Sequence, residues 1–435
     1  MSLLIISNNK FSTVRNNGKT LASFFEKSEL TNLYQLSLHN DVFDINIGSH
    51  ALTITPAGLS FGSDSDDINF KDSLSSCNVN ESYTQKDTVD VQRKGRGKNI
   101  LNPIVNLFSK LKRRSFFNLI CRDIIYLPSF IISFFRVASF VKEKNIKKIF
   151  FVYPDFLFFQ YFVIFLVKAT NVKLTIYFTD DYLLDFNPTD SLIRKRGGYA
   201  TLLNANVRKL FKLNPRFFVI SQKMSDIYLN MFGITSQVLI NSNSLSINNV
   251  EVTRGCLVKS QKIRISYFGS LHSGRNESLI KFSNLVVEYV SRTGVDVVIN
   301  VYTSDKVDIC SGDFPPLVHF AQPCIGESYL KKVEGSDYLL FMEGFSKEDI
   351  KSTWLSCSTK IPEYLSSKKP IIAFGPPQNG SMDLLISNEL GIYLNDSDIG
   401  EHFNEELVHS ITDSAFKYYI DNFSKEIMMQ RLSYE

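Results

Sequence analysis

The sequence has few cysteines and no pair of them spaced to hold a metal ion. Its 435 residues include six cysteines, and none of these belongs to a C-x-x-C motif. Scattered cysteines are typical of proteins that work in a reducing compartment. We therefore expect a cytoplasmic protein with neither a zinc site nor a disulfide framework.

An excess of one charge is also lacking. Lys and Arg together number 48, Asp and Glu number 44, and the net charge is +4. Proteins that bind nucleic acid through its phosphates usually carry a stronger positive excess, so we expect no nucleic-acid partner. The first residues, MSLLIIS, have no basic start and no small-residue cleavage site, which predicts a strand rather than a signal peptide.

One apolar run, residues 149–167, is long enough to cross a bilayer. Pro154-Asp155 interrupts this run near its start, and Gln160 places a polar side chain in the remainder. Polar and charged groups inside a membrane are costly. The run is therefore predicted to be a strand, Ile149–Tyr153, followed by a buried helix over Phe156–Lys168.

The chain is longer than one hydrophobic core usually holds, which predicts two domains. Hydrophobic residues make up 44% and charged residues 21%, a globular composition. Predicted strands and helices alternate in both halves. The expected fold class is therefore α/β, with two Rossmann-like domains that face each other across a cleft.

The stretch Leu355–Pro377, LSCSTKIPEYLSSKKPIIAFGPP, is the most informative part of the sequence. It predicts a helix over about Thr359–Ser367, with Ser358 as its N-cap, because apolar residues recur there at helical spacing. The apolar run Ile371–Phe374 then predicts a buried parallel strand. The turn after it lies at the carboxyl end of the strand, where open α/β sheets bind ligands.

The start of this predicted helix has chemistry that suits a phosphate. Helix N-terminal N–H groups bind anions, and Lys360 adds a positive charge beside them. Glu363 lies one turn further on, where its carboxylate can accept hydrogen bonds from sugar hydroxyls. A phosphate next to a ribose or hexose describes a nucleotide-sugar. The alternative is that Glu363 is a surface helix residue and Lys360 is solvated.

The segment STKIPEYLSSKKPIIAFGP resembles the donor-binding segment of GT-B glycosyltransferases of families 4 and 1. The similarity is greatest to bacterial enzymes that build capsule, O-antigen and lipopolysaccharide. It implies that Glu363 binds the ribose of the donor and that Thr359 and Lys360 lie near its diphosphate. The family has a glycine where this chain has Lys368, and many retaining members have an earlier glutamate where this chain has Leu355.

Glu343, in FMEGF, is the nearest alternative to that earlier glutamate. The resemblance extends to the glycine turn Gly269-Ser270-Leu271, which follows a predicted strand at a place where backbone approaches phosphate. In the family a loop of this form supplies an arginine to the diphosphate, here Arg275, and a guanidinium suits bidentate contact. Ser381 is predicted to cap a further helix and to offer another anion site.

The first half offers candidates for the acceptor side. The segment NNGKTLASFF resembles the opening of the same enzymes and places Asn17, Gly18 and Lys19 in a loop beside the cleft. Lys19 faces phosphate or acceptor there, or is solvated. Asp180 and Asp181 follow a predicted strand and are candidates for positioning or deprotonating an acceptor hydroxyl. The alternative is a pair of aspartates that cap the next helix.

A basic and apolar segment, LFSKLKRRSFFNLI, includes Lys110–Arg114. Its mixture of four basic residues with Leu, Phe and Ile is typical of contact with anionic lipid, or of an ordinary amphipathic surface helix. The first reading predicts a peripheral position at the inner face of the plasma membrane.

The resemblance implies sugar transfer from a nucleotide-sugar to a glycan or polyprenyl-linked acceptor, with retention and without a bound metal or other cofactor. Two alternatives are a non-catalytic GT-B-like subunit that binds nucleotide or glycan, and a nucleotide-sugar epimerase. The expected divisions are an acceptor-side domain over 1–247 with a flexible insertion over 62–98, a linker over 248–262, a donor domain over 263–412, and a C-terminal helix over 413–435 that packs back on the first domain.

Overall fold

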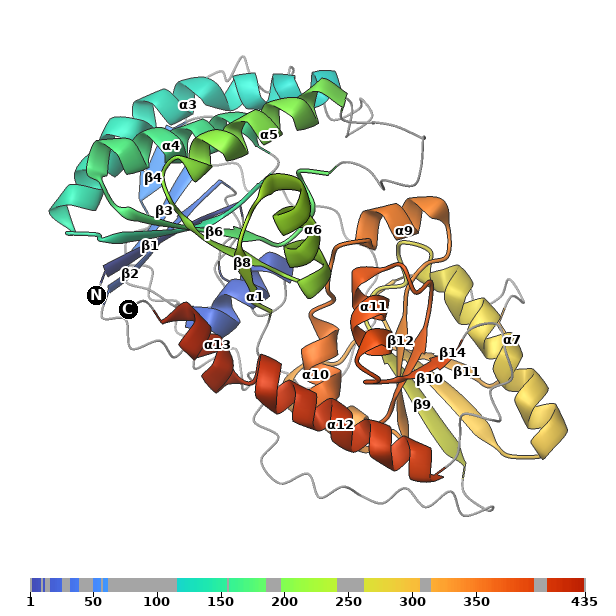
Figure 1. Ribbon diagram of the computed structural model, residues 1–435. Helices are drawn as coiled ribbons and strands as arrows, with labels where there is room; N and C mark the ends of the chain where they lie inside the picture. The colour runs from blue at the N-terminus through green and yellow to red at the C-terminus, as the bar shows by residue number, and fades with distance from the viewer. Residues whose placement is uncertain are drawn as a thin grey trace, which may run out of the picture.

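The computed structural model contains two α/β halves that lie next to each other (Figure 1). The structure describes residues 2–8, 11, 16–25, 32–38, 50–55, 58–61, 116–154, 156–184, 197–240, 262–305, 314–394 and 405–433. The insertion predicted over 62–98, most of the predicted linker and the basic segment Lys110–Arg114 lie outside these residues.

The first half is built on a sheet in the order β4-β3-β2-β1-β5-β6-β7-β8, parallel except where β3 and β4 pair antiparallel. Its central strands β1 and β5 are mainly apolar and almost wholly buried, as expected for a sheet covered on both faces. The strands are β1 Ser2–Ser7, β2 Asn32–Ser37, β3 His50–Thr55, β4 Gly58–Phe61, β5 Lys148–Val152, β6 Lys173–Phe178, β7 Arg216–Val219 and β8 Ser236–Val238.

Three helices lie side by side over one face of this sheet (Figure 1). They are α3 Phe116–Glu143, α4 Leu157–Thr170 and α5 Gly197–Phe211, while α1 Asn16–Phe25 and α6 Gln222–Phe232 complete the half. The Phe130 ring of α3 stacks on Phe159 of α4, with 5.5 Å between centroids. The apolar run 149–167 is thus β5 and the buried helix α4, which confirms the prediction of a strand and a core helix.

The second half has a sheet of six strands, all parallel, in the order β11-β10-β9-β12-β13-β14. These strands are β9 Ile263–Phe268, β10 Val297–Tyr302, β11 Val318–Ala321, β12 Tyr338–Met342, β13 Ile371–Phe374 and β14 Ile392–Leu394. The helices between them are α7 Arg275–Thr293, α8 Gly326–Glu334, α9 Lys347–Thr353, α10 Lys360–Ser366 and α11 Gly380–Ser387. The predicted pair of α/β domains is confirmed.

The end of the chain joins the two halves a second time. Helix α12, Glu405–Phe423, packs on α10, and α13, Lys425–Leu432, begins at the N-cap Ser424. Arg216 of β7 donates to the carbonyl of Arg431 at 2.6 Å, and Arg431 donates to the carbonyl of Val238 at 2.8 Å. Helix α13 therefore lies against the first sheet. The expected domain boundaries stay a prediction, since residues 241–261 lie outside the described part of the chain.

Lys368 has an unusual backbone conformation for a lysine. It follows α10 at the position where the resembling enzymes have glycine, and its φ of +54° lies in the left-handed region. Its ammonium group sits 4.3 Å from the centroid of the Phe416 ring of α12. Lys368 therefore adopts a turn conformation that favours glycine, and its side chain makes this conformation sterically strained.

We expect Lys368→Gly to be more stable than Lys368→Ala by about 1 kcal/mol, because glycine relieves the strain of the left-handed backbone. Both variants lose the contact with Phe416, so the comparison isolates the backbone. Urea unfolding of the two variants measures the difference. Equal stability of the two, or a more stable alanine variant, would contradict the prediction.

Candidate functional site

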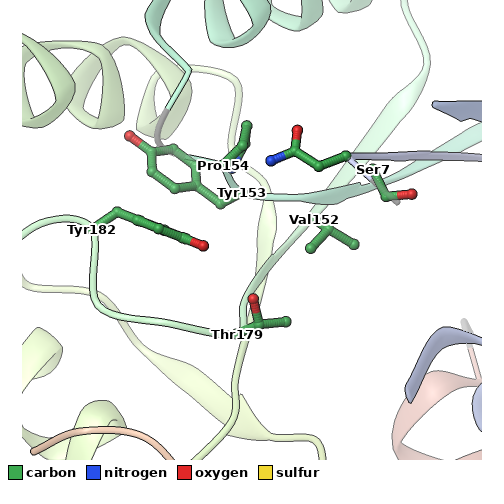
Figure 2. Close-up of a pocket in the computed structure, with 7 residues that line it drawn as sticks. Ser7, Val152, Tyr153, Pro154, Thr179 and Tyr182 are labelled. Atoms are coloured by element: carbon green, nitrogen blue, oxygen red, sulfur yellow. The ribbon is translucent and has the colours of Figure 1, made fainter. Parts of the chain in front are cut away.

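A small pocket opens at the carboxyl edge of the first sheet (Figure 2). Ser7 at the end of β1, Tyr153 after β5 and Thr179 after β6 contribute to its lining, together with Asn8 and Tyr182. Parallel strands bring their carboxyl ends to one edge, which is why residues distant in sequence meet there. The Asn8 side-chain oxygen is buried without a hydrogen-bond partner among the described residues.

The two aspartates beside this pocket have different environments. Asp181 accepts hydrogen bonds from the backbone N–H of Leu184 at 2.9 Å and from the Tyr228 hydroxyl at 3.0 Å. It therefore anchors the chain after β6 to α6. The Asp180 carboxylate accepts from the Tyr182 hydroxyl at 3.3 Å and lies next to the pocket residue Thr179. Burial and Asp181 raise the pKa of Tyr228 well above its ordinary value, so this phenol stays a donor.

The predicted acceptor-side loop is wrong in its local structure. Asn17, Gly18 and Lys19 lie in the first turn of α1, which begins at Asn16. Glycine costs about 1 kcal/mol in a helix interior through its greater backbone entropy, and its place in the first turn leaves the rest of α1 to better helix formers. The structure thus places Asn17, Gly18 and Lys19 inside the start of helix α1 and not in a loop before it.

The second site is the glycine turn after β9. Gly269 has a φ of +124°, a conformation that residues with a side chain rarely adopt, and a Cβ there would press on the end of the Lys360 side chain. Asp305, after β10, accepts from the Ser270 hydroxyl at 3.0 Å and from the backbone N–H of Leu271. His272 lies 3.5 Å from the same carboxylate. Asp305 therefore fixes the turn, and it was missed because its partners are distant in sequence.

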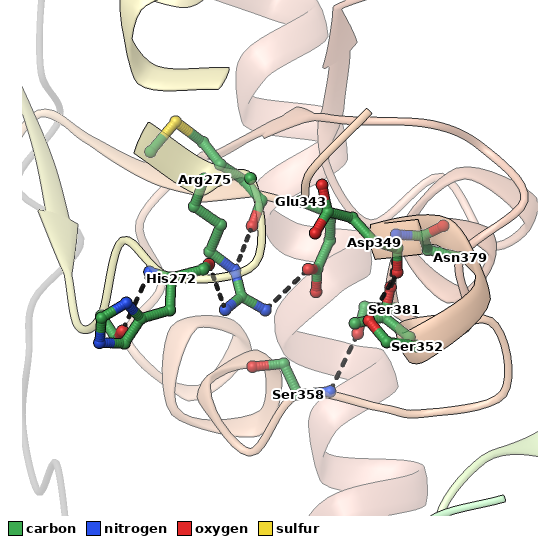
Figure 3. A network of polar contacts seen from close by, with 12 residues as sticks. His272, Arg275, Glu343, Asp349, Ser352, Ser358, Asn379 and Ser381 are labelled. Carbon is green, nitrogen blue, oxygen red and sulfur yellow. Dashed lines mark hydrogen bonds and ion pairs between the residues drawn. The ribbon is translucent and has the colours of Figure 1, made fainter. Parts of the chain in front are cut away.

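Arg275 is the first residue of α7 rather than a loop residue as predicted. Its guanidinium donates to the Glu343 carboxylate at 2.7 Å and to the carbonyl of Met342 at 3.1 Å (Figure 3). Ser278, one turn further along α7, donates to the carbonyl of Glu343 at 2.8 Å. The start of α7 is thereby fixed to the end of β12, and Arg275 and Glu343 meet at the edge of the sheet.

This ion pair lies in a largely desolvated place. Burial raises the pKa of Glu343 above its ordinary value, and Arg275 and Lys360 oppose only part of that rise. Burial lowers the pKa of Arg275, but Glu343, Tyr267 and Asp349 together raise it above its ordinary value, so the guanidinium stays charged. A cation in such surroundings interacts strongly with any anion that enters, because water screens little there.

Lys360 begins α10 and points its ammonium group at the glycine turn. It donates to the Tyr267 hydroxyl at 3.4 Å and lies 4.6 Å from the centroid of that ring. Burial and the neighbouring Arg275 lower the pKa of Lys360 to about 7, although Glu343 acts in the opposite direction. Two basic groups thus converge where the sheet ends, and one of them loses its charge near neutral pH.

Glu363 lies one turn into α10, opposite Tyr329 of α8. Burial and the Glu363 carboxylate raise the pKa of Tyr329 well above its ordinary value. The Glu363 side chain is half-buried, so it is more than a solvated surface residue. The Leu355 side chain, at the position of the family's earlier glutamate, is buried, and its carbonyl accepts from Ser221 of the first half at 2.6 Å.

Two predicted helix caps are wrong. Asn379, not Ser381, is the N-cap of α11, and Ser381 lies inside the helix. The Ser381 hydroxyl instead accepts from the backbone N–H of Ser358 at 2.9 Å, so it joins α11 to the segment before α10 (Figure 3). Thr359 takes the cap position of α10 that was predicted for Ser358. Helices α10 and α11 each start one or two residues from the predicted position. The hydrogen bond between Ser381 and Ser358 joins the starts of the two helices, and sequence spacing does not reveal it.

The structure therefore brings most of the predicted donor residues to one edge of the second sheet. The glycine turn contains Gly269 and Ser270. Arg275, Glu343 and Lys360 lie around it. Asn379 is a residue that the sequence did not reveal: it is buried, its amide nitrogen donates to Thr353 at 2.7 Å, and its oxygen has no partner among the described residues.

No family model matches the chain, and no curated protein matches it either. Solved structures do match over nearly the whole length. The glycosyltransferase from Rickettsia africae ESF-5 has a TM-score of 0.56 at 11% sequence identity, over 99% of this chain and 96% of that chain. The lipopolysaccharide outer core galactosyltransferase WaaB, in its apo form, has a TM-score of 0.55 at 12% identity, over 99% and 98% of the two chains.

A third match is the trehalose-6-phosphate protein from E. coli bound with UDP-2-fluoro glucose, with a TM-score of 0.56 at 10% identity over 99% of this chain and 98% of that chain. At such low identities the likeness shows the fold. The chain has the GT-B fold of glycosyltransferases, with its two Rossmann-like domains, as the sequence predicted.

The pKa of Lys360 predicts a pH-dependent effect on stability. In the unfolded chain this amine has its ordinary pKa of 10.5, and in the folded protein about 7. Between these values the unfolded chain binds a proton that the folded protein does not, so stability falls as the pH falls from 10.5 to 7. We expect Lys360→Met to raise the melting temperature relative to the intact protein at pH 7 and much less at pH 10.

Lys347→Met, at an exposed position on α9, is the control for loss of a lysine. Melting temperatures of the three proteins at pH 7 and pH 10 measure the effect. An equal change at both pH values for Lys360→Met would show that the amine is not desolvated as the structure indicates.

Proposed function

We propose that this protein is a glycosyltransferase that moves a sugar from a nucleotide-sugar to a glycan or polyprenyl-linked acceptor in surface polysaccharide biosynthesis. The observation that carries the proposal is the convergence of Arg275 and Lys360 on the glycine turn after β9. These two basic side chains suit a diphosphate leaving group, and the charge of Lys360 changes near neutral pH. The backbone of the glycine turn also lets a phosphate approach closely. The GT-B fold and its match to a galactosyltransferase and to a UDP-sugar complex support the donor class.

In this proposal the residues have distinct roles. Arg275 and Lys360 stabilise the leaving diphosphate, Glu363 holds the ribose, and Glu343 contacts the donor sugar. The present contact between Arg275 and Glu343 keeps both charges paired before the donor binds. When a diphosphate approaches Arg275, Glu343 becomes available to accept hydrogen bonds from sugar hydroxyls.

Lys360 couples donor binding to proton uptake. A diphosphate near the ammonium group favours its charged form, so an amine with a pKa of about 7 takes up a proton as the donor binds. Thr359, Ser270 and Ser381 lie on the segments around this position and are proposed to bind the donor with them. That the reaction needs no metal ion stays a prediction. It rests on Arg275 and Lys360, which would neutralise the diphosphate in place of a metal.

The first half supplies the acceptor side in this proposal. Asp180 lies next to the pocket at the ends of β1, β5 and β6, and we assign it, rather than the anchored Asp181, to the acceptor hydroxyl. Asn17, Gly18 and Lys19 at the start of α1 follow β1, the central strand of the same sheet. The reaction is proposed to proceed with retention at the cytoplasmic face of the membrane, with Lys110–Arg114 as a lipid contact.

One observation favours a second candidate function. The buried Leu355 occupies the position of a glutamate that many retaining GT-B enzymes have. A protein that binds nucleotide through Arg275 and Lys360 but lacks this carboxylate could act as a non-catalytic subunit of an assembly complex. Glu343 decides between the two, because only the enzyme needs its carboxylate for turnover.

A thermal-shift screen against UDP, GDP, ADP, CMP and TDP tests the donor site. A ligand at a hundred times its dissociation constant stabilises the folded state by about 2.7 kcal/mol. We expect one of these nucleotides to raise the melting temperature of the intact protein and to lose that effect in Arg275→Ala.

The matched control is Arg264→Ala, at the amino end of β9, where Arg264 pairs with Asp337 at 3.1 Å far from the glycine turn. This variant should keep the nucleotide response. No response of the intact, folded protein to any of the five nucleotides would remove both the transferase and the nucleotide-binding subunit from consideration.

Turnover separates these two functions. With the nucleotide-sugar of the base that binds, we expect the intact protein to release nucleoside diphosphate when a polyprenyl-linked acceptor is present. Glu343→Gln should slow that release at least tenfold, a typical loss when one polar contact to the reacting sugar is removed. Nucleotide binding without release from any donor would support the non-catalytic subunit instead.

A further inference from the structure

Helix α3 turns an apolar face to the outside of the molecule. Ile124, Ile131, Ile132 and Phe135 are between 53% and 70% exposed. Ile131, Ile132 and Phe135 follow Ile124 by seven, eight and eleven residues, so the four side chains form one stripe along the helix. Large apolar side chains in a continuous stripe are unusual on a protein surface and mark an interaction site.

The opposite face of α3 packs into the first half through both apolar and polar side chains. Asp123, Ser129 and Ser133 are buried against the rest of the first half, together with Phe130 and Val137. A helix on the surface of a globular protein normally has polar residues outside, whereas α3 has large apolar residues on both faces. The distribution along α3 therefore indicates that its outer face meets an apolar medium.

The neighbouring helices extend this surface. Phe165 of α4 is 55% exposed and Leu202 of α5 is 39% exposed. The three helices lie side by side on the same face of the first sheet (Figure 1). We call these six apolar residues, Ile124, Ile131, Ile132, Phe135, Phe165 and Leu202, the outer patch.

Positive charge accompanies the outer patch. Among the described exposed side chains of α3, α4 and α5, five are basic and one is acidic, although acids and bases are nearly balanced in the whole chain. The basic ones are Arg136, Lys142, Lys168, Arg208 and Lys209, and the acidic one is Glu143. Apolar side chains with basic residues beside them suit a membrane that carries anionic lipid.

We propose that the α3–α4–α5 face docks on an anionic lipid surface, with α3 lying in the plane of the membrane interface. The apolar stripe enters the boundary between headgroups and acyl chains, and the basic side chains contact the headgroups. This inference uses neither the donor site nor residues 110–114, so its test is independent of the test of the proposed activity.

Helix α3 is long and apolar enough to cross a membrane by length and composition, over Asp123–Glu143, but its inner face is occupied. The Asp123 carboxylate accepts from the backbone N–H of Leu157 at 2.8 Å at the start of α4, and Phe130 stacks on Phe159. A spanning position would break these contacts and expose a buried carboxylate to lipid. Contact through the outer face alone keeps them.

A second copy of the chain is a poorer occupant of this surface. A twofold interface places the same patch on both subunits. Two faces with five basic residues and one acidic residue each would then bring like charges together. An anionic lipid surface satisfies both the apolar stripe and its charges.

Sedimentation with vesicles tests the proposal. We expect the intact protein to pellet with vesicles of equal parts phosphatidylglycerol and phosphatidylcholine and to bind vesicles of phosphatidylcholine alone at least tenfold more weakly. The double variant Ile131→Glu, Phe135→Glu should lose at least tenfold in affinity for the anionic vesicles. The matched control is Met231→Glu, Ile420→Glu, which alters exposed apolar residues of α6 and α12 and should bind as the intact protein does.

Circular dichroism melting establishes that both double variants are folded. If the α3 variant does not fold, hydrogen exchange of the intact protein provides the second measurement, and vesicles should slow exchange in the α3 peptides. Equal binding of both double variants, or no binding of the intact protein to anionic vesicles, would overturn the proposal. A dimer that forms without lipid and is lost in the α3 variant would assign the patch to a second copy. The thermal shift with nucleotide should persist in the α3 variant. The lipid proposal and the proposed function can then be tested independently of each other.

Discussion

The buried ion pair between Arg275 and Glu343 constrains the whole second half of the molecule. It joins the first residue of α7 to the end of β12, the strand next to β9, and so holds the glycine turn between β9 and α7 in one shape. Removing one partner from such a pair leaves an uncompensated charge and typically costs about 3–5 kcal/mol. The pair also keeps a cation at the carboxyl edge of the sheet, where water screens it little. In the proposed function, stability and donor binding thus depend on the same two side chains.

Much of the fold could be predicted from local patterns. The apolar runs of β12 and β13 are short and are bounded by glycine, proline or charged residues, which is the signal of buried parallel strands. The stretch over Leu355–Pro377 contains helix, strand and turn in the predicted order, because each is determined by neighbours within a few residues. The candidate residues Gly269, Arg275 and Lys360 could be named for the same reason, since each starts or follows a predicted element.

The contacts that complete the site could not be predicted in this way. Arg275 and Glu343 are 68 residues apart, and Asp305 reaches the turn at Leu271 from the loop after another strand. The hydroxyl of Ser381 serves a segment 23 residues away instead of its own helix. The outer face of α3 was missed for a related reason. Both faces of this helix carry large apolar residues, so periodicity alone does not say which one α4 covers.

The second crossing of the chain has a mechanical consequence. The polypeptide passes from the first half to the second between residues 240 and 262, and it returns at Ser424, where α12 ends and α13 begins. Two bodies connected at a single point can turn about it in any direction, whereas two bodies connected at two points turn about the line that joins them. Hinges of this kind are a few residues at the ends of elements. Two crossings of the chain therefore restrict any rotation of one half relative to the other to the axis through these two places.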